Sequence, residues 1–166
     1  FVGNLDKISG EFEFGHNVKI GYFDQQMAQL NSNKTVFDEF YDTFPGLTVT
    51  EVRNSLAAFM FYGEDVFKKI SMLSGGEKVR LALCKILKTG PNVLILDEPT
   101  NHMDIIGKES LEDMLKEYKG TLIFVSHDRF FVNKIANKIL SFEKGEAKFY
   151  DCGYSEYLDK KSKEVE

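Results

Sequence analysis

Two neighbouring carboxylates, Asp97 and Glu98, are of the residue type that can hold a hard cation and activate a water molecule. They directly follow the apolar run VLIL at residues 93–96, which is typical of a strand buried on both faces. Ligands of open α/β sheets bind beyond the carboxyl ends of the strands. We therefore expect Asp97 to bind Mg²⁺, and Glu98 to position or deprotonate a water that attacks a phosphate group. Taken alone, the pair is equally well explained as solvated acids at the end of a strand.

The segment SGGEK at residues 74–78 predicts a helix whose first turn faces an anion. Ser74 fits the N-cap position, and Glu77, three residues later, fits the reciprocal position of a capping box. The free N–H groups and the positive dipole end of such a helix attract a phosphate, and Gly75 and Gly76 leave room for it to approach the backbone. On its own, S-x-x-E more often marks an ordinary capped helix, so this segment gains meaning from the motifs that accompany it.

His127 and Gln25 follow two further apolar runs in the same manner. His127 comes just after residues 121–125 and could donate a hydrogen bond to the γ-phosphate of a nucleotide. Gln25 follows a strand candidate at residues 19–23, and its amide could reach Mg²⁺ or the attacking water. Each residue is weak alone, but the four features in one order favour a nucleotide-hydrolysing site. The usual phosphate loop, G-x-x-x-x-G-K-[ST], does not occur in the 166 residues.

Alternating apolar and amphipathic stretches predict an α/β fold with a parallel sheet that positions these residues. Its strands are expected at residues 19–23, 93–96 and 121–125. Residues 141–142 and 147–150, joined through Lys-Gly, predict a hairpin at the edge of the sheet.

A helical stretch separates the first strand from the SGGEK segment. Helices are expected at residues 35–41, 48–61 and 64–69, with a break at Pro45-Gly46. The predicted organisation is an α/β core of residues 1–25 and 74–154, an inserted helical subdomain of residues 26–73, and a charged tail of residues 155–166. The tail is expected to be either a surface helix or the start of a linker.

Composition excludes several classes of function. A net charge of -5, without a block of Lys or Arg, does not support direct binding to bare nucleic acid. The chain has no apolar run of about 18 residues and no signal-like segment, so we expect no membrane insertion and a cytoplasmic location. Cys84 and Cys152 form no C-x-x-C pair, which indicates reduced thiols and no metal cluster.

With these residues in place, the chain resembles the nucleotide-binding domain of the ATP-binding cassette (ABC) superfamily. Residues 74–78 resemble its signature motif, residues 93–98 its Walker B segment, and residues 101–104, which end in Asp104, its D-loop. Gln25 resembles the Q-loop glutamine and His127 the switch histidine. More narrowly, EPTNHMD and VSHDRFF resemble the ABC-F group, soluble proteins with two such domains on one chain, several of which act on the ribosome. Met103 replaces the usual Leu of that group, which is a conservative departure.

The resemblance implies a P-loop NTPase-like sheet that is incomplete at its N-terminal side, because the Walker A loop would lie just before Phe1. It also implies ATP and Mg²⁺ as cofactors, and a second ABC ATPase domain as partner, either on the same parent chain or in a homodimer. Ser74, Gly75, Gly76 and Asp104 would then bind nucleotide in the shared sites. The signature of one domain completes the site of the other, whereas Gln25, Asp97, Glu98 and His127 serve the domain's own ATP. A short helical stretch without room for an extra arm resembles the second domain of the group.

The favoured interpretation is that the chain is part of an ABC-F-type ATPase, which acts in translation or antibiotic resistance. The chain alone is expected to be inactive. One alternative is the ATP-binding subunit of an ABC transporter, and a second ATPase domain on the same chain would argue against it. Another alternative is a non-enzymatic interaction module, which a phosphate loop encoded upstream would eliminate. A strand missing from the sheet leaves an unpaired edge, so we also expect dimerisation or poor solubility.

Overall fold

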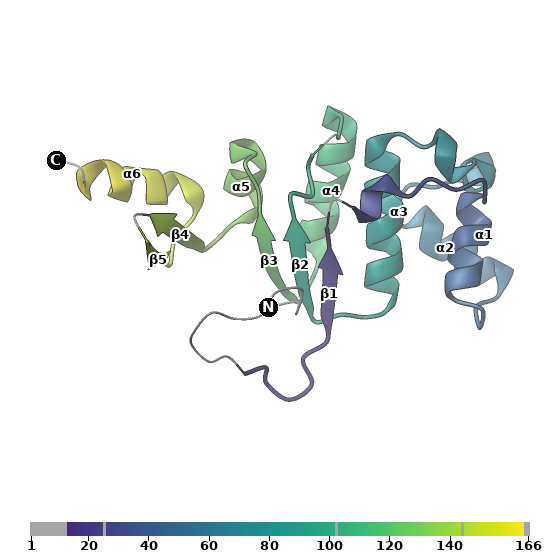
Figure 1. The fold of residues 1–166 in the computed structure, drawn as a ribbon, viewed down its shortest axis with the longest axis horizontal. Coiled ribbons are helices and arrows are strands. Elements are labelled where there is room, and N and C mark those ends of the chain that lie inside the picture. Colours follow the sequence, from purple (N-terminus) through teal and green to yellow (C-terminus); the bar gives the residue numbers. More distant parts are fainter. Residues whose placement is uncertain (1–12, 25, 102, 144, 165–166) are drawn as a thin grey trace.

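A computed structural model describes residues 13–24, 26–101, 103–143 and 145–164. Its centre is a parallel sheet of strands β1 (Ile20–Phe23), β2 (Val93–Asp97) and β3 (Thr121–Val125), in that spatial order (Figure 1). The register aligns Phe23 with Leu96, and Leu96 with Phe124. The α/β fold class and all three parallel strands are therefore confirmed, each within one residue of its expected bounds.

Three helices cover one face of this sheet: α3 (Gly75–Lys88), α4 (Ile105–Glu117) and α5 (Arg129–Ile135). On the covered face Leu94 and Leu96 are fully buried against apolar side chains of these helices. Gly21 shows how closely α3 approaches, since a Cβ on it would lie 2.6 Å from Ile86 Cγ2. Packing of this face therefore fixes the three strands relative to the helices.

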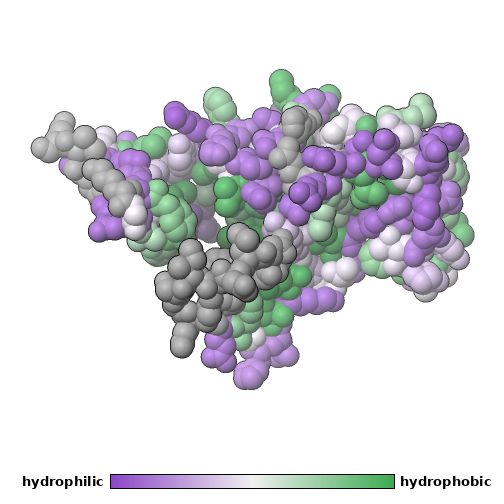
Figure 2. Space-filling model, viewed as in Figure 1, coloured by the Kyte–Doolittle hydropathy of each residue, from purple (hydrophilic) through white to green (hydrophobic). Residues whose placement is uncertain are grey.

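The opposite face of the sheet is open among the described residues. Alternate side chains of β3 point to it, and Ile123 and Val125 are 47% and 59% exposed. In the described part of the chain β3 pairs with β2 and with no other strand. Figure 2 shows green apolar surface where the central strands adjoin the left-hand end of the molecule. Parallel sheets are normally covered on both faces, so an open face and a free edge are unusual.

The helical region begins with the short turn η1 (Met27–Gln29) and continues through α1 (Val36–Thr43) and α2 (Val49–Ala57) to the turns η2 (Gly63–Phe67) and η3 (Ile70–Met72). The expected second helix ends earlier than residue 61, because Met60 adopts a left-handed φ of 65°. Phe61 N–H then donates to the Leu56 carbonyl at 3.1 Å, a contact that closes a helix. The expected third helix is a 3-10 turn.

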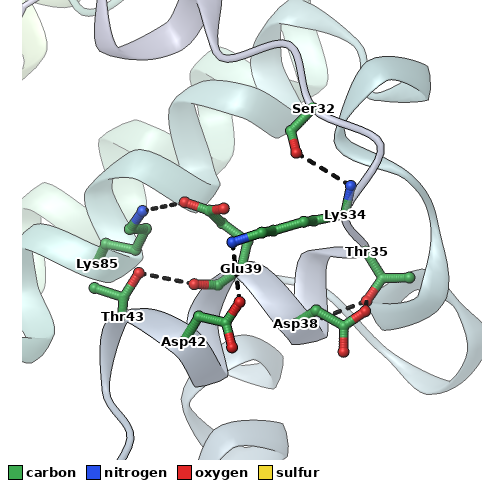
Figure 3. Close-up of polar contacts among 8 residues, drawn as sticks. All are labelled: Ser32, Lys34, Thr35, Asp38, Glu39, Asp42, Thr43 and Lys85. Atoms are coloured by element: carbon green, nitrogen blue, oxygen red, sulfur yellow. Dashed lines mark hydrogen bonds and ion pairs between the residues drawn. The ribbon is translucent and has the colours of Figure 1, made fainter.

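Helix α3 joins the helical region to the sheet. Its Val79 and Leu83 pack in the sheet cluster, whereas its Leu81 and Cys84 pack with the helical region. Lys85 of α3 also pairs with Glu39 of α1, with 2.6 Å between Nζ and Oε1 (Figure 3). The boundary between residues 73 and 74 stays a prediction, since the helical region shares α3 with the core.

Strands β4 (Ile139–Glu143) and β5 (Glu146–Tyr150) form the expected hairpin, followed by helix α6 (Tyr154–Glu164). The prediction that this hairpin lies at the edge of the parallel sheet is wrong, because within the described residues β4 pairs with β5 alone. One face of the hairpin packs on α6 instead, where the rings of Tyr150 and Tyr157 lie 5.0 Å apart. Tyr157 is buried, so α6 packs on the hairpin, and the start of a linker in this tail stays a prediction.

Candidate functional site

The acid pair and the histidine segment lie at one edge of the sheet. Asp97, the last residue of β2, is aligned with Val125, the last residue of β3. Glu98 follows Asp97, and its N–H donates to the Val125 carbonyl at 2.9 Å. His127 is two residues beyond Val125. The parallel register therefore places Asp97, Glu98 and His127 at one edge of the sheet.

Glu98 and His127 are in direct contact. The His127 N–H donates to Glu98 Oε2 at 3.3 Å, and His127 Nε2 lies 3.4 Å from Glu98 Oε1. The two side chains differ greatly in exposure, 16% for Glu98 and 96% for His127. A shielded carboxylate beside an exposed imidazole can hold a water while the imidazole contacts a bound ligand.

The backbone and one oxygen of Glu98 are both unusual. Its φ is 47°, a left-handed conformation that costs about 1–2 kcal/mol for a residue with a side chain. Its Oε1 is buried and has no hydrogen-bond partner within the described residues, since the 3.4 Å approach of the imidazole lacks hydrogen-bond geometry. Both features are typical of functional positions, because strain and an unsatisfied acceptor are otherwise selected against.

The site fits Mg²⁺ by its donor chemistry. Asp97, the last residue of β2, offers an exposed carboxylate at this edge of the sheet. Mg²⁺ usually takes one or two carboxylates and fills its remaining positions with water and phosphate oxygens. Gln25, the other expected metal ligand, lies outside the described residues.

The SGGEK segment forms the capped helix start that its sequence predicts. Ser74 Oγ accepts from Glu77 N–H at 3.2 Å, and Glu77 Oε2 accepts from Ser74 N–H at 2.8 Å. Burial acts to raise the pKa of Glu77, but the hydrogen bonds from Ser74 and the nearby Lys68 outweigh it and lower that pKa. Glu77 therefore stays ionised, and the capping box fixes the first turn of α3, which begins with Gly75 and Gly76.

The start of α3 packs directly on the start of α4. A Cβ placed on Gly76 would lie 3.6 Å from Asp104 Oδ1 and 3.8 Å from Gly107 Cα. Asp104 is the N-cap of α4, where its Oδ1 accepts from Gly107 N–H at 2.9 Å. The structure thus gives Asp104 a capping role, and its expected contact with nucleotide stays a prediction.

Sequence reasoning assigned no role to Lys108 or Asp128. Lys108 Nζ of α4 lies 2.6 Å from Asp128 Oδ2, next to His127. Asp128 also caps α5, because its Oδ1 accepts from the N–H groups of Phe130 and Phe131 at 3.1 and 3.2 Å. The hydrogen bond from Lys108, supported by those from α5, lowers the pKa of Asp128. An Asp just before a helix is a general signal for an N-cap and could have identified this role, but no sequence pattern indicates a partner 20 residues away.

The described residues contain neither a cluster of metal ligands nor a membrane-spanning helix. No group of three or more His, Cys, Asp or Glu residues in that part of the chain could hold a metal ion by itself. Likewise, the helices formed by these residues are too short or too polar to cross a membrane.

Comparison with known proteins gives consistent matches. Residues 6–101, more than half of the chain, match the family model described as ABC transporter. The ATP-binding protein YdiF of Bacillus subtilis is 47% identical over 99% of this chain and 26% of the relative. ABC transporter F family member 5 of Arabidopsis thaliana is 41% identical over 99% of this chain and 25% of the relative. The energy-dependent translational throttle protein EttA of Escherichia coli K12 is 36% identical over 93% of this chain and 29% of the relative.

A solved structure supports the fold. The ATP-binding cassette MJ0796, in a dimeric post-hydrolysis state bound to ADP and Pi, matches with a TM-score of 0.64 and 22% identity, over 81% of this chain and 63% of that chain. The present chain spans about a quarter of the length of the curated relatives above. The relatives include members of the F group. These matches, together with the signature and Walker B segments, identify the chain as a member of the ATP-binding cassette family.

Proposed function

We propose that this chain supplies hydrolytic residues to an ABC-F ATPase, which converts ATP and water to ADP and phosphate. The contact between Glu98 and His127 carries the proposal, because it joins a shielded carboxylate to an exposed imidazole at the carboxyl edge of the sheet. In this proposal Glu98 Oε1 accepts a proton or hydrogen bond from the attacking water. His127 donates to the γ-phosphate and so distinguishes ATP from ADP.

Asp97 and Gln25 would hold Mg²⁺, with Asp97 contributing its exposed carboxylate. When bound, Mg²⁺ would neutralise charge that develops on the phosphate oxygens. The protein's own contribution is to keep Glu98 oriented through its Val125 and His127 contacts, so that its free oxygen faces the water.

The proposed partner is a second ABC ATPase domain, on the same parent chain or in a homodimer. Ser74, Gly75 and Gly76 lie at the N-terminus of a 14-residue helix that can face the phosphates of a partner's ATP. Glu98 and His127 would serve a different ATP, the one held by this domain. The chain thus contributes to two shared sites.

The 166 residues alone are proposed to be inactive, because they contain no phosphate loop. The open face and free edge of β3 support the proposal that a strand and helix carrying this loop pack there in a longer protein. The same edge supports the expected association of the isolated chain. Light scattering at high concentration tests this, and a monodisperse monomer would count against it.

We further propose that the parent protein acts in translation, in the cytoplasm, and that the ribosome is its partner. The support is the relationship to a translational throttle protein and to other F-group members. Involvement in antibiotic resistance is one form that such an action could take.

ATP turnover by the full-length protein tests the proposed chemistry. Glu98→Gln keeps the size of the side chain but removes its basicity, so we expect a loss of about 10²-fold or more in kcat. Glu117→Gln is the matched control, since Glu117 is an exposed carboxylate near the end of α4 and should leave kcat unchanged. Equal activity of the Glu98 variant and the wild type would reject the assignment.

The proposed partner is tested by sedimentation of the Glu98→Gln protein with ribosomes. We expect co-sedimentation that requires ATP and is not supported by ADP, because the variant should retain bound ATP. Absence of ribosome binding, together with co-purification of a membrane-spanning protein, would favour the transporter alternative.

A further inference from the structure

The first turn of α4 contacts both candidate half-sites of this chain. At its start, Gly107 and Asp104 pack on Gly76, whose Cα lies 3.7 Å from where a Gly107 Cβ would be. The next residue, Lys108, pairs with Asp128 at 2.6 Å. A single helical turn therefore connects the segment that would serve a partner's ATP to the segment that holds His127.

Asp128 is held through its backbone N–H and both oxygens of its carboxylate. One of its carboxylate oxygens accepts from the Phe130 and Phe131 N–H groups, and the other is taken by Lys108. Its own N–H donates to Ser126 Oγ at 3.1 Å, across His127. Since His127 sits between two tethered residues and its N–H contacts Glu98, a shift of Asp128 must also move His127.

We propose that Lys108 is a positioning residue, whose ion pair with Asp128 fixes the His127 loop to α4 and so transmits a displacement at Gly76 to His127 and Glu98. This inference rests on the proposed ATPase function. Lys108 acts through Asp128, because its Nζ pairs with Asp128 Oδ2. Coupling of this kind needs a contiguous set of contacts, and the chain from Gly76 to Glu98 provides one.

The structure contains a matched control for this claim. Lys134 of α5 pairs with Glu112 of α4 at 2.6 Å, so this ion pair also joins α4 to α5. It differs in touching neither the first turn of α4 nor the segment of residues 126–128. If an ion pair acts only by holding α4 against α5, its removal should have the same effect at Lys108 and at Lys134.

The first test measures ATP turnover by the full-length protein. We expect Lys108→Met to lower kcat about tenfold with KM within about twofold, because a misplaced group loses rate rather than binding. Lys134→Met should leave kcat within about twofold, and Lys108→Arg should restore most of it by keeping the charge. Equal losses in the Lys108→Met and Lys134→Met proteins, or no rescue by Arg, would overturn the inference.

The second test does not depend on turnover. Hydrogen exchange of the amides at Asp128, Phe130 and Phe131 should accelerate about tenfold in Lys108→Met and remain near wild type in Lys134→Met, since only the first frees Asp128. Asp128→Asn keeps the Oδ1 cap but loses the charge, and it replaces Lys108→Met if that variant does not fold. If exchange is faster in Lys108→Met but the wild-type protein shows no ATP turnover, the ATPase function is rejected and the positioning role of Lys108 stands. Normal turnover and unchanged exchange in Lys108→Met would reject the positioning role of Lys108 and leave the ATPase function standing.

Discussion

The helical region and the parallel sheet differ in how fully the described residues cover their apolar side chains. Phe40 of α1 and Leu56 of α2 are completely buried, and Leu96 on the inner face of the sheet is as well. On the outer face of the same sheet, Ile123 and Val125 are about half exposed. The buried cluster of the helical region is therefore closed by its own residues and α3, although Phe67 and Met72 stay exposed at its surface. In contrast, the described residues leave the outer face of the sheet uncovered, and parallel sheets are normally covered on both faces.

The largest expected effect separates the closed region from the open face. Phe40→Ala should lower the free energy of unfolding by about 3–5 kcal/mol, since it leaves a cavity in a buried cluster. Ile123→Ala should cost within about 0.5 kcal/mol in the 166-residue chain, because the side chain faces solvent. Urea denaturation measures both, and a similar cost for the two variants would remove the contrast.

The second prediction sharpens the contrast by repeating the substitution in the full-length protein. In the full-length protein Ile123→Ala should cost about 2 kcal/mol or more, because the outer face is then expected to be buried. Thermal unfolding of full-length variants provides the measurement, with exposed Glu117→Gln as the control for nonspecific effects. A cost as small as in the 166-residue chain would mean that this face stays open.

A smaller effect compares the same motif in the two regions. Thr48 caps α2 and Ser74 caps α3, each with a complete capping box. Replacement of either residue by Ala should cost about 1 kcal/mol of stability. In the full-length protein, only Ser74→Ala should also reduce ATP turnover, since its helix is the one proposed to face a phosphate. Loss of turnover in Thr48→Ala would show that capping alone explains the result.

The smallest effect concerns the exposed contact between α6 and the hairpin. The hydrogen bond from Lys161, with others from Ser141 and Tyr157, lowers the pKa of Glu143 from 4.5 to about 2. Because the folded pKa is depressed, this contact stabilises α6 fully above about pH 4.5 and loses its effect as the pH falls through about 2. Titration of the Glu143 carboxyl by NMR should show this, and Lys161→Met should return its pKa towards 4.5. An unshifted wild-type pKa would contradict the contact.

Much of the fold could be predicted from the sequence because its signals are local. The apolar runs before Asp97 and Ser126 indicated β2 and β3, and the capping box of Ser74 and Glu77 marked the start of α3. The end of α2 could not be predicted, since the left-handed turn at Met60 lacks the glycine that usually signals it. The separation of the hairpin from the sheet depends on packing with α6, which no local pattern encodes.

The candidate site divides in the same way. Glu98, His127 and Ser74 were predicted from motifs, and the structure brings Glu98 and His127 into contact. The pairing of Lys108 with Asp128 is a tertiary contact between two surface-type residues, and only the structure reveals it. Gln25 lies outside the described residues, so its place near the site stays a prediction.

Phosphate release from ATP by the purified 166-residue chain tests the central claim most directly. The chain is proposed to hold the hydrolytic residues without a phosphate loop, so we predict no release from it. The full-length protein should release phosphate and lose this activity on Glu98→Gln. Phosphate release by the 166 residues alone, abolished by Glu98→Gln in the same chain, would contradict the account.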